Sequence, residues 1–178
     1  MATYKRLDLL PKVLGAYTSG QLPSLHAIVV VWQDTSTNPP EWLTQPDAQR
    51  AVPVYVRVSK QNSMNERFRM DSRVQTQALF MVDDDLVIQH SDLEWGFSVW
   101  KQMGRAERII GFAGRDYVFE NGAYTFVVMP RMTYSMILSN AAFLDRTFFE
   151  LYWDQKVEPF RQHVDKGTSH RDLLVWFS

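Results

Sequence analysis

The sequence contains no cysteine, which excludes a disulfide framework and any thiolate metal site. It also lacks a strong net charge: the formal value is −1, Lys and Arg form no basic run, and there is no electrostatic case for binding nucleic acid or an anionic membrane. No apolar stretch approaches the roughly 20 residues needed to span a bilayer, and no signal-peptide pattern follows Met1. What is present is 178 residues with 46% hydrophobic content, which predicts a single globular domain over residues 1–178 with a substantial core.

Several common catalytic signatures are absent too. There is no G-x-S-x-G nucleophile motif, no phosphate-binding G-x-x-x-x-G-K-S/T loop and no G-x-G-x-x-G dinucleotide fingerprint. The histidines show no metal-ligand spacing, and the D-x-D/N-x-D/N-G pattern of a calcium loop is missing. These absences argue against a serine or cysteine hydrolase, against these two kinds of nucleotide site and against a calcium site.

The most informative stretch runs from Ala78 to Leu86, where an apolar run ends abruptly in Asp83, Asp84 and Asp85. A short run of this kind predicts a buried strand, and acids at its carboxyl end would lie at the mouth of an open α/β sheet, where ligands bind. Adjacent carboxylates repel one another, so a hard cation such as Mg²⁺ or Mn²⁺ gives them a reason to cluster. The alternative interpretation is a solvated acidic turn that binds nothing.

The remaining pattern alternates helices with buried strands, which predicts an α/β domain with a mixed sheet. Ile28–Val31 is a continuous β-branched run typical of a parallel strand, and it follows a predicted helix over residues 9–17 that Asp8 would cap. A βαβ unit would place a strand ahead of that helix, and the sequence predicts none before Tyr4. Further strands are predicted over Val52–Val58, Leu79–Val82, Ile109–Phe112 and Met136–Leu138, and a hairpin is predicted around Asn121-Gly122. A helical turn is predicted over Glu41–Leu43 and a loop over Lys60–Arg69. The remaining predicted helices are one behind the capping box Ser91–Glu94, one capped by Asp145 and one over Glu158–Val164.

Ordered blocks of sequence carry a family resemblance that covers nearly the whole chain. The blocks are Thr3–Arg6 with Leu9-Leu10, Ile28–Trp32 with Pro39-Pro40, Asn62–Phe68, Met81–Asp85, Phe97–Trp100 with Ile110–Phe112 and Arg115, and Tyr134–Met136 with Ala141–Phe143. Each block alone is weak, and together, in this order, they resemble the exostosin-type domain of glycosyltransferase family 64. That resemblance implies the GT-A fold, a mixed sheet flanked by helices.

The resemblance implies a retaining transferase that takes an N-acetylhexosamine from a UDP-sugar with Mn²⁺, or Mg²⁺, and passes it to a glycan or glycoconjugate acceptor. It also implies a location in the endoplasmic reticulum or Golgi. At the matching motif positions, Asp85 would contact the metal, and the candidate catalytic residues would be Asp172 and Arg67. The candidate nucleotide-sugar-binding residues are Arg6, Gln33, Asn62, Arg67, Asp83 and Asp84. A surface salt bridge for either arginine and an ordinary turn for Asn62 are the competing interpretations.

Departures from the family pattern bear on activity. Gln33-Asp34 stand where the family has Asn, and Arg171 stands where the family has the first acid of its N-C-D/E-D block, with Asp172 on the second. The family's first strand and C-terminal segment have no counterpart, which predicts a sheet incomplete at both ends. We therefore expect this chain to transfer sugar poorly or not at all. The competing hypothesis is a non-catalytic domain of the same fold that binds UDP-sugar and metal or serves as an interaction module.

Overall fold

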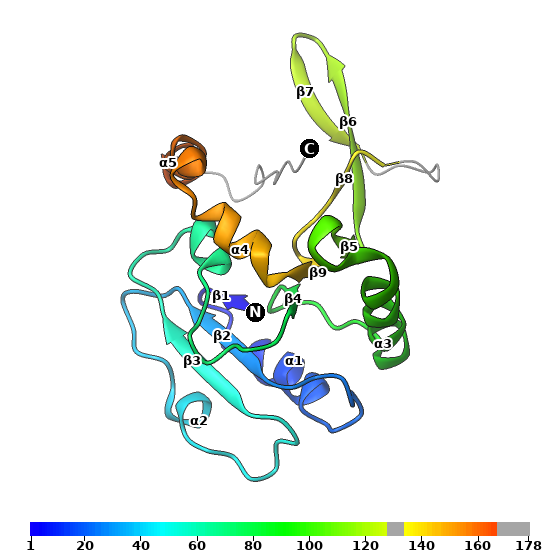
Figure 1. Cartoon of the computed structure of the whole chain (residues 1–178). Helices are drawn as coiled ribbons and strands as arrows, with labels where there is room; N and C mark the ends of the chain where they lie inside the picture. The colour runs from blue at the N-terminus through cyan, green and yellow to red at the C-terminus, as the bar shows by residue number, and fades with distance from the viewer. Residues whose placement is uncertain (128–133, 167–178) are drawn as a thin grey trace.

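The predicted β-branched strand is β2 (Ile28–Trp32), the middle strand of a parallel three-stranded sheet (Figure 1). The computed structural model describes residues 1–127 and 134–166. The neighbours of β2 are β1 (Ala2–Thr3) and β3 (Val54–Val58). The expectation that no strand precedes Tyr4 is wrong, because backbone groups at the start of the chain bond to the edge of β2 and form β1.

A second sheet has the order β4-β9-β5 and is antiparallel. Its strands are β4 (Ala78–Val82), β9 (Ala141–Asp145) and β5 (Ile110–Gly111). Every residue of β9 is buried, although its sequence has no β-branched residue and predicts no strand. A parallel bridge between Ala2 and Asp83 joins the two sheets. The predicted core strands therefore lie in two sheets, and the acids that follow β4 lie beside the end of β1.

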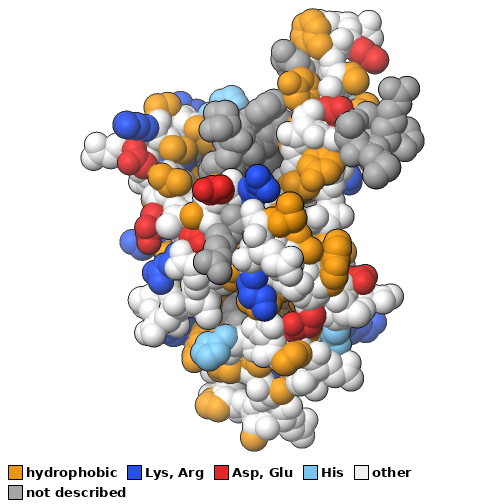
Figure 2. Space-filling model, turned by 45° about the vertical axis from the view of Figure 1, so that its right-hand side comes forward, with side chains coloured by type: hydrophobic (Ala, Val, Ile, Leu, Met, Phe, Trp, Pro, Cys, Tyr) orange, Lys and Arg blue, Asp and Glu red, His pale blue; other side chains and the backbone are white. Residues whose placement is uncertain are grey.

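β6 (Gly114–Glu120) and β7 (Ala123–Val127) form the hairpin predicted around Asn121-Gly122. Both turn residues have positive φ, 54° at Asn121 and 79° at Gly122, as a two-residue hairpin turn requires. β8 (Met136–Ile137) pairs with the other edge of β6. The hairpin projects from the body of the molecule (Figure 1), and hydrophobic side chains gather on this projection (Figure 2).

The helices are short. They are α1 (Leu10–Tyr17), α2 (Glu41–Thr44), α3 (His90–Val99), α4 (Arg146–Tyr152) and α5 (Glu158–Lys166), with a π turn over Trp100–Gly104 and 3₁₀ turns over Met64–Phe68 (η1), Arg105–Glu107 and Gln155–Val157. In the described ranges, no helix combines the length and the apolar character needed to cross a membrane.

The predicted caps were right for one helix and wrong for two. No side chain caps α1, so the predicted role of Asp8 is wrong. No side chain caps α3 either, because the helix begins at His90 with Gln89 in the N-cap position, so Ser91 lies inside it. Glu94 of the predicted capping box instead accepts hydrogen bonds from the N–H and the hydroxyl of Ser24, at 3.0 and 2.7 Å. The cap of α4 is confirmed, since Asp145 accepts from the Thr147 N–H at 3.0 Å.

Two hydrophobic clusters hold these elements together. The first includes residues of α1, β2, α3 and β9, namely Leu14, Val30, Trp32, Leu93 and Phe143. The second includes residues of η1, β4, β9 and α4, namely Phe68, Met81, Leu144, Phe149 and Tyr152. Within it, the rings of Phe68 and Tyr152 stack with centroids 4.4 Å apart. Residues 60–69 were expected to form a loop, and this packing is why η1 forms within them.

Candidate functional site

The predicted binding residues follow the carboxyl ends of four strands. Parallel strands share one edge for their carboxyl ends, and the bridge between Ala2 and Asp83 brings β4 to the same edge. The residues that follow these ends are Arg6 after β1, Gln33 after β2, Asn62 after β3, and Asp83, Asp84 and Asp85 after β4. The fold thereby brings Arg6 into contact with Asp85 across 79 positions of sequence.

Each of the three acids has an arginine partner. Arg6 Nη1 lies 3.1 Å from Asp84 Oδ1 and also contacts Asp85 Oδ2. Arg67 Nη2 contacts Asp83 Oδ1. The three acids therefore do not form a freely solvated turn, and ligand binding by this turn stays a prediction. Arg67 forms its salt bridge below the surface, because only 6% of its side chain is exposed, whereas the pair of Arg6 with Asp85 is the exposed salt bridge of the competing interpretation.

Asp84 is the most deeply buried of the three acids, with 4% of its surface exposed. Burial raises the pKa of its carboxyl group, while the Thr3 hydroxyl and the Arg6 guanidinium oppose that rise. Arg67 Nε is buried without a hydrogen-bond partner within residues 1–127 and 134–166. Most buried polar atoms in proteins are paired, so this atom could donate to a polar ligand.

The outer part of the site is open to solvent. The side chains of Arg6 and Asp85 are 47% and 45% exposed, and that of Asp83 is 35% exposed. An ion pair as exposed as that of Arg6 and Asp85 contributes at most about 1 kcal/mol. Arg6 can therefore leave Asp85 at little cost, whereas Arg67 is held in place by burial.

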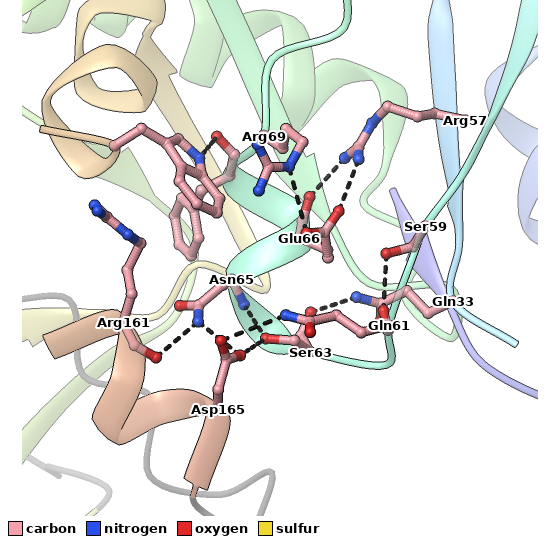
Figure 3. A network of polar contacts seen from close by, with 12 residues as sticks. Gln33, Arg57, Ser59, Gln61, Ser63, Asn65, Glu66, Arg69, Arg161 and Asp165 are labelled. Carbon is pink, nitrogen blue, oxygen red and sulfur yellow. Dashed lines mark hydrogen bonds and ion pairs between the residues drawn. The ribbon is translucent and has the colours of Figure 1, made fainter. Parts of the chain in front are cut away.

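A network of polar contacts ties η1, which carries Arg67, to α5 (Figure 3). Asn65 is 1% exposed, and its Nδ2 donates to Asp165 Oδ1 at 2.8 Å and to Arg161 O at 2.9 Å. Ser63 Oγ contacts Asp165 and accepts from the Asn65 N–H at 3.1 Å. These contacts fix the backbone of η1 and, with it, the position of Arg67.

The other side of η1 is tied to the parallel sheet (Figure 3). Gln33 Nε2 donates to Ser63 O at 2.5 Å, and the Gln33 N–H donates to Thr3 O at 3.0 Å. Arg57 of β3 donates to Glu66 Oε2 at 3.2 Å and to Glu66 O at 2.5 Å. Burial lowers the pKa of Arg57, and the Glu66 carboxylate opposes this effect. The turn is thus held between α5 and the strands β2 and β3.

Two predicted site residues lie apart from the paired charges, and a third is not among the described residues. Gln33 is buried, and its amide nitrogen is bonded to Ser63. Asn62 is exposed on the loop immediately before Ser63. Asp172, the predicted catalytic acid, lies outside the described residues.

The sequence motifs did not identify the residues that hold the site together. Asn65 and Glu66 lie inside the block Asn62–Phe68, which carries part of the family resemblance, but nothing in the sequence indicated their structural role. Arg57 and Asp165 had no sequence signal, because their partners are far away or in a turn that was expected to be a loop.

A metal ion could be held here only together with a ligand. The described part of the chain has no cluster of three or more His, Asp, Glu or Cys side chains arranged to bind a metal. Asp85 offers one solvent-open carboxylate at the strand ends. Mg²⁺ and Mn²⁺ are hard cations that proteins bind through one or two carboxylates, while substrate phosphates complete the coordination. The donor set fits such a shared site and does not fit a cation held by protein ligands alone.

Comparison with known proteins gives matches over most of the chain. The model of the Glycosyl transferase family 64 domain matches residues 1–177. Glucosamine inositolphosphorylceramide transferase 1 of Arabidopsis thaliana is 39% identical over 158 residues, which cover 87% of this chain and 20% of the plant protein. Exostosin-like 2 of Mus musculus is 35% identical over 188 residues, which cover 99% of this chain and 55% of the mouse protein. The chain thus spans between about a fifth and about half of the length of these relatives.

Proposed function

The chain belongs to glycosyltransferase family 64, and on this basis we propose that it binds a UDP-sugar at the carboxyl ends of β1 to β4 as the donor site of a retaining N-acetylhexosamine transferase. The GT-A fold is part of the same proposal. It is supported by the parallel strands β1 to β3, the antiparallel β9 and the acids at the shared edge. The plant relative is named as a transferase, which supports transfer chemistry for this chain.

The observation that carries the proposal is the sharing of Arg6 between Asp84 and Asp85, next to the pair of Arg67 and Asp83. A diphosphate needs cationic donors, and a guanidinium can bind its oxygens through two charge-assisted hydrogen bonds. The side chain of Arg6 is 47% exposed and that of its partner Asp85 is 45% exposed, so the guanidinium can turn from Asp85 toward phosphate. The buried carboxylate of Asp84 would then accept hydrogen bonds from ribose or sugar hydroxyls.

We assign Mn²⁺, or Mg²⁺, to Asp85, whose carboxylate is open to solvent. When bound, such a cation neutralises diphosphate charge and makes UDP a better leaving group. Arg6 has to release Asp85 for this site to form, which leaves its guanidinium available to the diphosphate. Arg67 keeps its pair with Asp83 and holds that carboxylate toward the donor sugar.

Two further parts of the proposal rest on family membership. The acceptor is a glycan or glycoconjugate, and the protein is located in the endoplasmic reticulum or Golgi. Asp172, with Arg67, is the proposed catalytic residue on the strength of its motif position. Gln33 and Asn62 are proposed to border the nucleotide, Gln33 from the end of β2 and Asn62 from the loop after β3.

Calorimetry with UDP tests the donor site. We expect binding with Mn²⁺ and at least tenfold weaker binding without it, and Asp85→Ala should abolish this metal dependence. Asp92→Ala changes an exposed acid on α3 and serves as the matched control, so it should bind UDP as the unchanged chain does. Equal affinity of the unchanged chain with and without Mn²⁺ would disprove the shared metal site.

A non-catalytic UDP-sugar-binding domain is the second candidate, and Arg171 favours it by replacing an acid of the family motif. Release of UDP from UDP-N-acetylglucosamine or UDP-N-acetylgalactosamine decides between the two. Background release together with metal-dependent UDP binding supports the non-catalytic domain. Mn²⁺-dependent turnover that is lost in Asp172→Asn supports the transferase.

A further inference from the structure

The hydroxyl group of Tyr17 binds the chain just after the three acids. It donates to Leu86 O at 3.1 Å and accepts from the Ile88 N–H at 3.1 Å, across 69 and 71 positions of sequence. Tyr17 is the last residue of α1 and is 4% exposed. Burial raises the pKa of this hydroxyl, and the hydrogen bond from the Ile88 N–H opposes the rise. The group therefore stays protonated, and it uses both its donor and its acceptor on the backbone of one short segment.

The acids lie in a turn that is anchored at both ends. At its start, the Asp83 N–H donates to Asn140 O at 3.1 Å. At its end, the Leu86 N–H donates back to Asp83 O at 3.4 Å, and the Leu86 carbonyl accepts from Tyr17. Asp85 lies between these two anchors, with 45% of its side chain exposed. The position of its backbone thus depends on Asn140 on one side and on Tyr17 on the other.

The helix α1 also holds the partner of Asp85. Arg6 O accepts from the N–H groups of Leu9 and Leu10, at 3.2 and 3.1 Å, where the helix begins. Tyr17 lies at the other end of the same helix. α1 therefore fixes the backbone of Arg6 at one end and the chain after Asp85 at the other, independently of their ion pair. If Arg6 turns away from Asp85, the two backbones stay at the same separation.

We propose that Tyr17 is a positioning residue of the donor site, which keeps the Asp85 carboxylate in place for a divalent cation once Arg6 has turned to the diphosphate. This inference rests on the proposed UDP-sugar site, and it adds a residue outside the sequence blocks that carry the family resemblance. Without the hydroxyl, Leu86 O and the Ile88 N–H lose a partner. The segment after Asp85 then gains conformational freedom that binding of the cation has to remove.

Calorimetry with UDP on Tyr17→Phe tests this role, because the change keeps the buried ring and removes only the hydroxyl. We expect the ratio of UDP affinity with Mn²⁺ to UDP affinity without it to fall about fivefold, the factor that one hydrogen bond of ordinary strength supplies. UDP affinity without metal should stay unchanged, since Asp85 reaches the diphosphate only through the cation. Ser24→Ala is the matched control and should keep the ratio of the unchanged chain. Its hydroxyl also links the segment after α1 to the chain that follows the acids, but through Glu94 of α3.

Amide exchange of the ligand-free chain separates positioning from a general loss of stability. The Ile88 N–H donates to the Tyr17 hydroxyl, so its exchange in Tyr17→Phe should be faster by on the order of tenfold. The amides of β2, whose residue Val30 is fully buried in the core, report opening of the whole fold. Their exchange should increase less than that of Ile88.

Two results would overturn this inference alone. One is an affinity ratio in Tyr17→Phe equal to that of the unchanged chain or of Ser24→Ala. The other is an equal increase of exchange at Ile88 and in β2, which would show that the hydroxyl supports the core as a whole. A failure of the proposed function would instead be seen in the unchanged chain, as equal UDP affinity with and without Mn²⁺. That result would remove the cation site and, with it, the role of Tyr17.

Discussion

The side chain of Asn65 donates a hydrogen bond to Asp165 at 2.8 Å, across 100 positions of sequence. Asn65 is 1% exposed, and it also accepts from the Tyr152 hydroxyl and donates to the backbone of Arg161. A single buried amide thus joins η1, α4 and α5. Because Arg67 lies in the same turn, the proposed donor site depends on a contact with the far end of the described chain.

Replacing Asn65 should destabilise the protein far more than replacing its exposed neighbour. Asn65→Ala leaves several buried polar groups without a partner, and we expect the free energy of unfolding to fall by about 2–3 kcal/mol. Asn62→Ala is the matched control, since Asn62 is exposed, and it should change stability by no more than about 0.5 kcal/mol. Urea unfolding of both variants makes the comparison, and similar losses would show that the network does not hold η1.

Arg6 should matter for ligand binding and little for folding. We expect Arg6→Ala to weaken UDP binding at least tenfold, because the diphosphate loses a charge-assisted partner. Its ion pair with Asp85 is exposed and contributes at most about 1 kcal/mol to stability. Arg50→Ala is the control, since Arg50 pairs with Asp47 away from the strand ends, and it should bind UDP normally. Unchanged UDP affinity in Arg6→Ala would remove Arg6 from the donor site.

Stability of the chain that begins at Met1 should rise with pH between about 5 and about 8. Burial lowers the pKa of the Met1 amino group from 8.0 to about 5, with Arg67 and Arg57 also lowering it and Asp83 and Asp84 opposing them. In that range the unfolded chain binds more protons than the folded chain, so the free energy of unfolding increases with pH. Each pKa unit corresponds to about 1.4 kcal/mol, which sets an upper limit of about 4 kcal/mol.

Urea unfolding at several pH values measures this slope, and N-terminal acetylation provides the control. The acetylated chain keeps all histidines and acids and loses only the amino group, so its stability should depend less on pH over this range. Parallel pH profiles for the two forms would contradict the prediction.

Two glycine-to-alanine changes should have opposite effects on the free energy of unfolding. A Cβ at Gly111 of β5 would lie 2.2 Å from Ile137 Cγ2 and 3.1 Å from Ala141 O, so Gly111→Ala should cost about 1–3 kcal/mol. A Cβ at Gly15 of α1 would meet nothing within 4 Å, and alanine favours a helix, so Gly15→Ala should add about 0.5–1 kcal/mol. Thermal unfolding of both variants checks the prediction, and a stabilising Gly111→Ala would show that β5 can shift away from β8.

The family and the local elements could be predicted from the sequence. The ordered motifs predicted glycosyltransferase family 64, and this was confirmed. The β-branched run of β2, the Asn121-Gly122 turn and the Asp145 cap formed as predicted, because each depends on residues adjacent in sequence. The acids after β4 could also be placed at a strand end, since the change from apolar to acidic residues is local.

The partners of these elements were decided only by the tertiary structure. β9 is buried between β4 and β5, and its residues form a strand because both neighbours bond to it. η1 forms because Phe68 packs on Tyr152 and Asn65 bonds to α5, contacts that no nearby residue signals. Local patterns set which residues can form a helix, strand or turn, whereas long-range packing and hydrogen bonds select the partners. For that reason the three acids were visible in the sequence, and their sharing between Arg6 and Arg67 was not.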